Sequence, residues 1–360
     1  MLNKTRGNAV RARLAQEGIS QMLISDPCAL YWLCGRWIFP GERFLGLLLK
    51  SDGSAVFFIN RLFWSDEDLG VPVVWFDDVD DIMARVAGSC DHEKPLGVDK
   101  ILASRFLLPL MDARAASSFV NSSAAVDLSR AVKDEEEQAL MRESSRINDL
   151  AMDAFRHLVH EGVTELEIAD QTLAIYKSLG ASGYSFDPIV SFGANAADPH
   201  HMPDETVLKE GDCVLFDIGC RVNDYCSDMT RTFYYRREPD ARVKNIYNLV
   251  RRANETAEEM VQAGIPCSEI DKCARDIITE GGYGPQFNHR LGHFIGLEDH
   301  EYGDLSSANK RKTETGNIFS IEPGIYLAGD TGVRIEDLIL VTKDGHEVLN
   351  HYSKELTVID

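Results

Sequence analysis

The sequence contains no long hydrophobic run and no paired cysteine motif. Its strongly apolar stretches, such as residues 44–49, are far too short to cross a bilayer. The first residues lead into a polar helical pattern, not into the apolar core of a signal peptide. The eight cysteines are scattered without a CxxC pair, as in proteins whose thiols stay reduced and partly buried. We therefore expect a cytoplasmic protein without a membrane-spanning segment.

Basic residues are also scarce relative to acidic ones. Lysine and arginine number 37 against 58 aspartate and glutamate, which leaves a formal net charge of −21 at pH 7. Nucleic acids and anionic membrane surfaces bind basic patches, so we expect neither as a partner. With 44% hydrophobic and 26% charged residues over 360 positions, the composition is that of an ordinary globular protein with room for two domains.

The N-terminal part alternates helical and strand patterns and has no ligand-like cluster of histidine, cysteine or acidic residues. A turn sequence at residues 51–54 separates two apolar runs and predicts a hairpin. An acidic helix start then predicts a long helix from Ser129. We predict a small α/β domain over residues 1–128 and a second domain over residues 129–360. The elements expected in the first domain are a helix over 4–18 and strands over 21–25, 44–50, 55–60, 71–76 and 96–98.

In the second domain the order helix, helix, strand hairpin occurs twice, although the sequence itself does not repeat. Thr164 with Glu167 three residues later is a capping box and marks the start of one helix. This order predicts an α+β domain of two related halves around a common antiparallel sheet. The helices are expected over residues 129–160, 164–180, 241–263 and 268–280.

The segment Val214–Thr232 is typical of a hairpin, because two apolar runs flank a polar Arg-Val-Asn-Asp centre. Folding it in the middle of that centre places Asp217 opposite Asp228, with Cβ atoms about 5 Å apart. Two carboxylates at such a distance repel each other by roughly 4 kcal/mol at an effective dielectric constant of 20. A cation is therefore expected between them.

A second hairpin, Ile318–Val341, carries two glutamates in the same way. A turn centred on Gly329 places Glu322 opposite Glu336. Between the hairpins lies a histidine-rich stretch, residues 289–300, from which one imidazole would complete a set of two Asp, two Glu and one His. Oxygen-rich ligation of this kind suits Mn²⁺, Co²⁺, Fe²⁺ or paired Zn²⁺. Two divalent cations neutralise four carboxylates and can generate a hydroxide nucleophile, so the pattern indicates a two-metal hydrolase.

Each of these residues taken alone has a simpler explanation. An acidic residue in a strand usually lies on a solvated face, and a histidine is more often a structural residue than a ligand. The combination carries the inference. Two apolar hairpins with opposed carboxylates, and a Gly-His-x-x-Gly sequence between them, are a rare coincidence.

Several motifs resemble those of the M24 metallopeptidases of the prolidase and aminopeptidase P type. They are DIG…Y.SDMTRT around Asp217 and Asp228, HRLGHFIGL..HE over residues 289–301, SIEPGIY around Glu322 and GVRIED around Glu336. The resemblance covers the region from about Ser129 to the C-terminus, including a substrate-side segment over residues 185–200. It implies a pita-bread catalytic domain preceded by a smaller creatinase-type α/β domain.

The resemblance also implies which residues hold the metal ions. There would be two divalent ions, Mn²⁺ or Co²⁺ in the first place, with Zn²⁺ or Fe²⁺ as alternatives. Asp228 and Glu336 would bridge them. The five implied ligands are Asp217, Asp228, His293, Glu322 and Glu336.

Other residues acquire roles from the same resemblance. Glu322 would carry the proton from the attacking water to the leaving amine. His200 and His300 would face the scissile peptide as catalytic residues, whereas the neighbouring His201 is expected to have no catalytic role. Arg334 would orient a ligand carboxylate. The implied substrate-binding residues are Phe186, His289 and Phe294.

The implied activity is hydrolysis of the Xaa-Pro bond at the N-terminus of a dipeptide or short peptide, by a metal-bridging hydroxide, in a homodimer. Two departures from the family pattern bear on specificity. Phe294 is bulkier than the family's common glycine and is expected to narrow the pocket. The arginine with which many dipeptidases grip the substrate carboxylate is absent after His300, so Arg290 or the basic cluster at residues 310–312 would have to replace it.

Three alternatives stay open. A methionine-aminopeptidase-like enzyme would share the ligands but generally lacks the N-terminal domain and a sequence like Pro199-His200. A creatinase-like hydrolase that does not act on proline peptides, or a non-catalytic binding module on the same fold, would be expected to have lost metal ligands. All five are present here.

Overall fold

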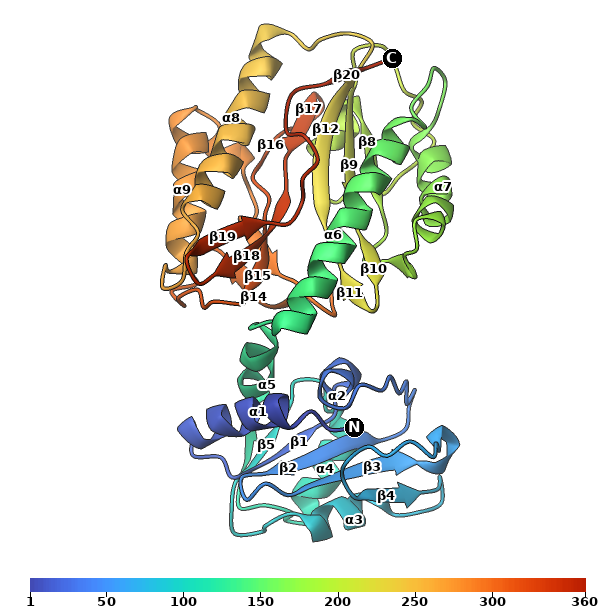
Figure 1. Cartoon of the computed structure of the whole chain (residues 1–360), viewed down its shortest axis with the longest axis vertical. Helices are drawn as coiled ribbons and strands as arrows, with labels where there is room; N and C mark the ends of the chain where they lie inside the picture. The colour runs from blue at the N-terminus through green and yellow to red at the C-terminus, as the bar shows by residue number, and fades with distance from the viewer. The chain divides into compact units, whose positions relative to one another are not determined.

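The chain divides into two units, Met1–Arg130 and Ala131–Asp360 (Figure 1). The computed structural model describes all 360 residues. Each unit has its own sheets and its own buried apolar core.

The helix predicted from Ser129 is wrong at its start. Helix α5 (Ser123–Arg130) belongs to the first unit, and α6 (Glu135–Arg156) begins only after a short non-helical stretch. Asp134 caps α6, and its side chain and that of Glu137 satisfy each other's backbone N–H groups. The acidic residues therefore mark the true helix start, several residues after the predicted one.

The first unit is built on one six-stranded mixed sheet in the order β4-β3-β2-β1-β5-β6. The hairpin predicted around residues 51–54 is present as β2 and β3, and the core includes Leu23, Phe58 and Val86. Its strands are β1 (Gln21–Ile24), β2 (Leu45–Lys50), β3 (Ala55–Asn60), β4 (Val73–Phe76), β5 (Leu96–Val98) and β6 (Phe119–Asn121). Its other helices are α1 (Lys4–Gln16), α2 (Pro27–Cys34), η1 (Arg61–Phe63), α3 (Ile82–Ser89) and α4 (Ser104–Asp112).

The second unit has the predicted order of elements in two halves. Helices α6 and α7 (Glu165–Ser178) contribute to one core with the strands from β8 to β12. Helices α8 (Ala241–Glu259) and α9 (Cys267–Glu280) lie side by side (Figure 1) and pack mainly with the strands from β13 to β18. The short 3₁₀ helices are η2 (Gly193–Ala197) and η3 (Gly284–Gln286).

The strands of this unit do not form one common sheet, which corrects the prediction. They form a four-stranded sheet, β20-β12-β9-β8, a five-stranded sheet, β14-β13-β15-β18-β19, and two smaller ladders, β11-β10-β7 and β16-β17. Both predicted hairpins are interrupted. The second is interrupted at Pro323, which has no backbone N–H to donate to the neighbouring strand. The strands are β7 (Gly183–Tyr184), β8 (Ile189–Phe192), β9 (Cys213–Ile218), β10 (Cys220–Val222), β11 (Tyr225–Cys226), β12 (Met229–Tyr235), β13 (Gly292–Phe294), β14 (Glu301–Leu305), β15 (Ile318–Ile321), β16 (Gly324–Leu327), β17 (Thr331–Arg334), β18 (Asp337–Thr342), β19 (Gly345–Val348) and β20 (Val358–Ile359).

The first hairpin has a register that differs from the predicted one. Asp217 on β9 pairs with Thr230 on β12 and not with Asp228. The turn consists of Asn223 and Asp224, whose φ angles of 48° and 71° are left-handed as in a two-residue hairpin turn. The fold line therefore lies one residue further along the chain than predicted. Asp228 becomes a diagonal neighbour of Asp217 and stays on the same face, because side chains alternate with period two.

Alternation along β9 sends its side chains into two different cores. Val214, Phe216 and Ile218 pack with α6 and α7, whereas Leu215 packs with the half that contains α8 and α9. Asp217 has the same parity as Leu215 and faces that half. The carboxylate therefore points toward the second hairpin.

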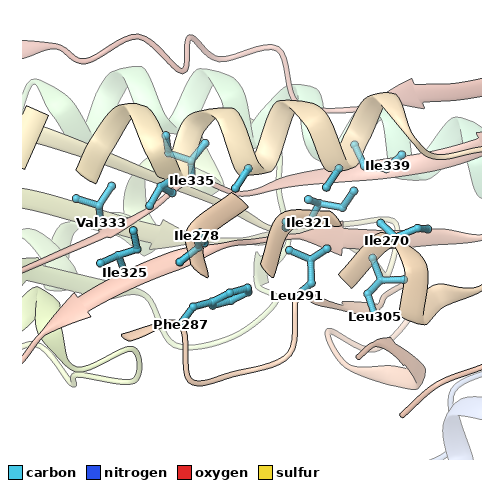
Figure 2. Packing of buried hydrophobic residues seen from close by; sticks show 14 of the residues in the cluster. Ile270, Ile278, Phe287, Leu291, Leu305, Ile321, Ile325, Val333, Ile335 and Ile339 are labelled. Atoms are coloured by element: carbon cyan, nitrogen blue, oxygen red, sulfur yellow. The ribbon is translucent and has the colours of Figure 1, made fainter. Parts of the chain in front are cut away.

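The second hairpin has the predicted register. Strand β15 pairs with β18, and β16 with β17, about a turn at Gly329. Glu322 and Glu336 fall opposite each other in the gap between these two ladders. The flanking Ile321 and Ile335 lie in the apolar core with residues of α9 (Figure 2). The two glutamates therefore point away from that core.

The helices of both units lack the combination of length and apolar character that crossing a membrane requires. The eight cysteines form no disulfide, and seven of them are buried. Burial raises the pKa of the Cys220 thiol to about 12, so this thiol beside the first hairpin stays protonated and is a poor nucleophile.

Replacing Gly292 with alanine should destabilise the protein strongly. An added Cβ would lie 1.9 Å from the Ser320 carbonyl oxygen, and neither backbone can move without disturbing the β13–β15 pair. We expect a loss of about 3 kcal/mol or more and a fall in Tm of about 6 °C or more. Gly183→Ala is the matched control, because no atom lies within 4 Å of its added Cβ. Equal melting temperatures for the two variants in thermal unfolding would contradict the assignment.

Candidate metal centre

A cavity of about 520 Å³ opens in the second unit, and most of the predicted site residues line it. They come from both hairpins, from the histidine-rich stretch and from the loop after η2. The predicted residues on its wall are Phe186, His200, Asp217, Asp228, His289, His293, His300, Glu322, Arg334 and Glu336. Residues that are 150 positions apart in the sequence thus share one cavity.

Three of the predicted ligands form the tightest group. Asp228, His293 and Glu336 are all buried, and each offers a ligand atom within 4.8 Å of the others. His293 Nε2 lies 3.4 Å from Asp228 Oδ2 and 3.8 Å from Glu322 Oε1. Glu336 Oε2 accepts a hydrogen bond from Thr230 Oγ1 at 2.7 Å, which orients it on the first hairpin. The arrangement has the oxygen-rich ligand chemistry that divalent cations prefer.

The carboxylates of this group are destabilised as anions. Burial raises the pKa of Asp228 well above its usual range, and the nearby Glu336 raises it further. Burial and the charge of Glu322 do the same to the pKa of Glu336. Burial also raises the pKa of Glu322 itself, to about 8. Carboxyl groups packed this closely need a nearby cation if they are all to be ionised near neutral pH.

Three carboxylate oxygens in the cavity have no hydrogen-bond partner; one is Oδ1 of Asp299, and the other two belong to predicted metal ligands. Oδ1 of Asp217 and Oδ1 of Asp228 are both buried and unpaired within the chain. An unsatisfied buried acceptor is costly, and native proteins rarely keep one without a ligand, water or ion. The residues therefore fit divalent metal ions by their donor chemistry.

The imidazole of His293 is oriented as a metal ligand. Its Nδ1 lies 3.3 Å from the carbonyl oxygen of Phe294, which can only accept a hydrogen bond. The proton is then on Nδ1, and the lone pair of Nε2 faces the carboxylates. Burial and the neighbouring His300 lower the pKa of His293 well below its ordinary value, so the ring is neutral.

Arg334 joins the two hairpins. Its Nη2 donates to Asp217 Oδ2 at 2.5 Å, and its Nε donates to Thr230 Oγ1 at 3.0 Å. Its Nη1 donates to the Tyr326 hydroxyl and to the carbonyl of Pro199, at 3.0 and 3.3 Å. The guanidinium thus orients a predicted ligand carboxylate and ties it to the loop that carries His200.

His289 supports this network from behind. Its Nδ1 donates to the carbonyl of Arg290 at 2.7 Å, so its Nε2 accepts from the Tyr326 hydroxyl at 2.9 Å. Burial and the charge of Arg334 lower the pKa of His289 to about 4, which keeps the ring neutral. Both ring nitrogens are therefore occupied, and the predicted substrate contact of His289 is limited to its ring surface.

His300 also lines the cavity, and its ring centroid lies 3.9 Å from that of His293. Arg290 Nη2 donates to its Nδ1 at 3.1 Å, so the proton is on Nε2 and available to a ligand. Asp299 Oδ2 lies 3.5 Å from that Nε2. Arg290, named from the sequence only as a candidate for the substrate carboxylate, lines the cavity. Asp299 and Tyr326 were not predicted as site residues, although Asp299 is the neighbour of a predicted one within the quoted motif.

Phe294 does not narrow the cavity, and its assignment as a substrate-binding residue is wrong. Its side chain is buried in the apolar core and lies 5.4 Å from the ring of Phe319. The physical reason is strand alternation on β13, which turns Phe294 away from the face that His293 presents to the cavity. Phe186, the other aromatic residue predicted to bind substrate, does line the cavity.

Comparisons with known proteins show the family to which the chain belongs. Residues 139–343 match metallopeptidase family M24, and residues 6–132 match the creatinase/prolidase N-terminal domain. A Staphylococcus aureus protein named an uncharacterized peptidase is 39% identical over 347 residues, which span 92% of this chain and 94% of that protein. The chain therefore belongs to the M24 metallopeptidase family.

Solved structures show the same architecture over the whole chain. The Xaa-Pro dipeptidase from Bacillus anthracis is 32% identical, with a TM-score of 0.90 over 99% of this chain and 100% of that one. The dipeptidase PepE from Mycobacterium ulcerans is 31% identical, with a TM-score of 0.92 over 99% and 97%. The prolidase from Pyrococcus horikoshii is 30% identical, with a TM-score of 0.88 over 98% and 99%. The predicted fold class, a pita-bread catalytic domain after a creatinase-type α/β domain, is confirmed.

The metal-free protein should lose stability between pH 6 and pH 9. The pKa of Glu322 in the folded protein, about 8, lies above that of an unfolded glutamate. The folded state therefore binds the proton more tightly, and this stability is present at low pH and lost as the pH rises through 8. A bound divalent ion should remove most of the dependence, since it stabilises the ionised carboxylates.

The measurement is the melting temperature at both pH values, after chelation and again with Mn²⁺ added. Glu258 also has a pKa raised to about 8 by burial, and it titrates with or without metal. The informative quantity is therefore how much the pH dependence of the melting temperature differs between the chelated and the Mn²⁺-loaded protein. Glu322→Gln should reduce that difference. A chelated protein that melts equally at pH 6 and pH 9 would count against the charge cluster.

Proposed function

We propose that the protein is a peptidase that uses two divalent metal ions to hydrolyse the Xaa-Pro bond at the N-terminus of dipeptides or short peptides. The observation that carries the proposal is the convergence of four carboxylates, three of them buried, and one neutral imidazole, with one oxygen each of Asp217 and Asp228 left unpaired. The solved relatives named as a prolidase and an Xaa-Pro dipeptidase support the choice of proline peptides.

The proposed ligands are Asp217, Asp228, His293, Glu322 and Glu336. Two divalent cations held there would neutralise the carboxylates, acidify a water molecule and polarise the scissile carbonyl. Mn²⁺ and Co²⁺ are the ions proposed first, because carboxylate oxygens dominate the set. Asp228 and Glu336, which come from different hairpins and lie in the tightest ligand group, are the proposed bridging pair.

Glu322 is the group proposed to move the proton. It takes a proton from the attacking water at Oε1 or Oε2 and delivers it to the proline nitrogen as the carbon–nitrogen bond breaks. Its carboxyl group has one contact at hydrogen-bond distance, from Ser320 Oγ to Oε1 at 3.4 Å, so the other oxygen is available. Products are then a free amino acid and a peptide that begins with proline, or proline itself.

His200 and His300 lie on the cavity wall and are the proposed contacts of the scissile peptide. The ring of His200 makes no hydrogen bond within the chain. His300 has its proton on Nε2, because its Nδ1 accepts a hydrogen bond from Arg290. Imidazole N–H donors at such positions stabilise the negative charge that develops on the carbonyl oxygen.

Asp228→Ala should abolish both metal binding and activity. The loss removes a ligand and leaves His293 facing an unbalanced site, so kcat/KM should fall by more than the roughly 100-fold that loss of an outer-shell partner can cost. Metal content by elemental analysis and hydrolysis of Ala-Pro with Mn²⁺ or Co²⁺ are the measurements. Glu280→Ala, at an exposed carboxylate on α9, is the control. An Asp228→Ala protein that still holds two metals and turns over normally would show that the site is elsewhere.

A substrate panel separates the alternatives. Ala-Pro and Ala-Pro-Ala test the proposal, Met-Ala-Ser tests a methionine-aminopeptidase-like activity, and creatine tests a creatinase-like one. A non-catalytic binding module would turn over none of them. Absence of metal-dependent hydrolysis of every proline peptide would refute the proposed function.

Arg290 is the proposed partner of the carboxylate of a dipeptide substrate. It lines the cavity, whereas the alternative basic cluster at residues 310–312 does not. An arginine in a partly buried cavity binds a carboxylate by charge-assisted hydrogen bonds. This favours a dipeptidase over an aminopeptidase that accepts longer chains.

Arg290→Ala should raise KM for Ala-Pro by about 10- to 100-fold, the cost of a lost charge-assisted hydrogen bond. The change for Ala-Pro-Ala should be smaller, because its carboxylate lies one residue further away. Lys310→Ala, on the exposed surface outside the cavity, is the control. Equal changes for the dipeptide and the tripeptide would rule out this role of Arg290.

Three further expectations about the protein in the cell stay predictions. They are the homodimer, the cytoplasmic location, and the absence of nucleic acid and membrane partners. The composition that motivates the last of these is an excess of 58 acidic over 37 basic residues.

A further inference from the structure

The loop that carries His200 is attached to the rest of the second unit through one buried carboxylate. Glu165 is the first residue of α7, where an acidic side chain usually points to solvent near the helix N-terminus. Here the side chain is fully buried, with a relative exposure of 0%. A buried carboxylate is stable only when its oxygens are well satisfied.

Four donors from the segment Phe192–Asp204 meet this carboxylate. Oε1 accepts from the Phe192 backbone N–H at 2.6 Å and from Asn195 Nδ2 at 3.0 Å. Oε2 accepts from His201 Nε2 at 2.6 Å and from the Asp204 backbone N–H at 3.2 Å. Both ends and the middle of the segment are thus tied to a single group.

The same residues have the spacing of a metal site, since Glu165, His201 and Asp204 offer ligand atoms within 4.8 Å of one another. The hydrogen-bond pattern argues against a cation there. Three N–H groups that can only donate already point at the carboxylate, and a cation would have to displace them. The cluster is therefore a hydrogen-bond hub.

His200 depends on this hub for its position. Its ring makes no hydrogen bond within the chain and its backbone N–H donates to Asp198 Oδ1 at 3.0 Å. His201 next to it turns toward Glu165, and His200 lines the cavity. On the other side of the segment, Arg334 donates to the Pro199 carbonyl at 3.3 Å. The loop is thus held between α7 and the metal centre.

We propose that Glu165, together with His201, is a positioning residue that acts through His200. The inference rests on the proposed function, in which His200 contacts the scissile peptide. Glu165 touches neither the cavity nor a proposed metal ligand, so its effect on the reaction is carried by the backbone of the loop. His201 thereby has a role without being catalytic.

A double-mutant cycle tests this inference. Glu165→Gln keeps the volume of the side chain but removes its charge. The NH₂ group of the glutamine can only donate, so it faces groups of the loop that also donate and cannot accept from them. In the wild-type background kcat for Ala-Pro should fall about 10- to 100-fold, the cost of a catalytic group misplaced by about 1 Å. KM and metal content should change little. In a His200→Ala background the same substitution should have almost no further effect on kcat.

Two variants keep the test informative. Glu167→Ala removes the side-chain oxygen that accepts from the Thr164 backbone N–H at the same helix start. Glu167 has no contact with the loop, so this variant should lower Tm and leave kcat unchanged. If Glu165→Gln fails to fold, His201→Ala at a partly exposed position removes one of the four donors, and it should show a smaller loss of kcat that also vanishes beside His200→Ala.

The outcomes separate the two proposals. A wild-type protein that hydrolyses no proline peptide refutes the proposed function. An active wild type in which the losses from Glu165→Gln and His200→Ala multiply, or in which Glu165→Gln has no effect on kcat, refutes only the positioning role.

Discussion

Mutual repulsion among buried carboxylates is the constraint on which the second unit depends. Asp228, Glu322 and Glu336 line one cavity, and burial together with neighbouring carboxylates raises the pKa of each. Such a cluster is unfavourable in an isolated chain and becomes favourable when cations occupy it. The hydrophobic packing of the two halves must therefore hold the carboxylates together until the ligand arrives.

Strand alternation is how the fold meets this requirement. Each hairpin places apolar residues on one face and acidic residues on the other, so the packing that buries Phe216 or Ile321 also directs Asp217 or Glu322 into the cavity. Arg334 and Thr230 then connect the two acidic faces by hydrogen bonds to Asp217 and Glu336. The alternation of side chains along these strands therefore both stabilises the cores and sets the geometry of the site.

A second network surrounds the first and uses neutral imidazoles and hydroxyls. Arg334 donates to the Tyr326 hydroxyl, which donates to His289. Arg290 donates to Nδ1 of His300 and so keeps the proton of that ring on Nε2. Glu165 provides the corresponding support for the loop of His200. Outer groups of this kind decide tautomer and orientation, and the precision of a catalytic site depends on them.

Much of the metal centre was predictable because its determinants are local. The fold line of the first hairpin lies one residue from its predicted place, which moves the partner of Asp217 by two residues, from Asp228 to Thr230. Because side chains alternate with period two, Asp217 and Asp228 still share a face, as predicted. The predicted register of Glu322 and Glu336 was right, because Gly329 marks the turn. The position of Phe294 was less predictable, because the register of β13 against β14 shifts between His293 and Phe294, and packing against Phe319 places the ring in the core.

By itself, the sequence determined the two-domain order, the capping of the helix that starts at Glu165, and the parity that puts each acidic side chain on one face of its hairpin. These follow from contacts within a few residues. Only the tertiary structure decided that the sheet is divided, that Arg334 bonds to Asp217, and that Glu165 is buried beneath the His200 loop. Those contacts join residues about 30 to more than 100 positions apart, and their partners are selected by packing between elements, which no local pattern encodes.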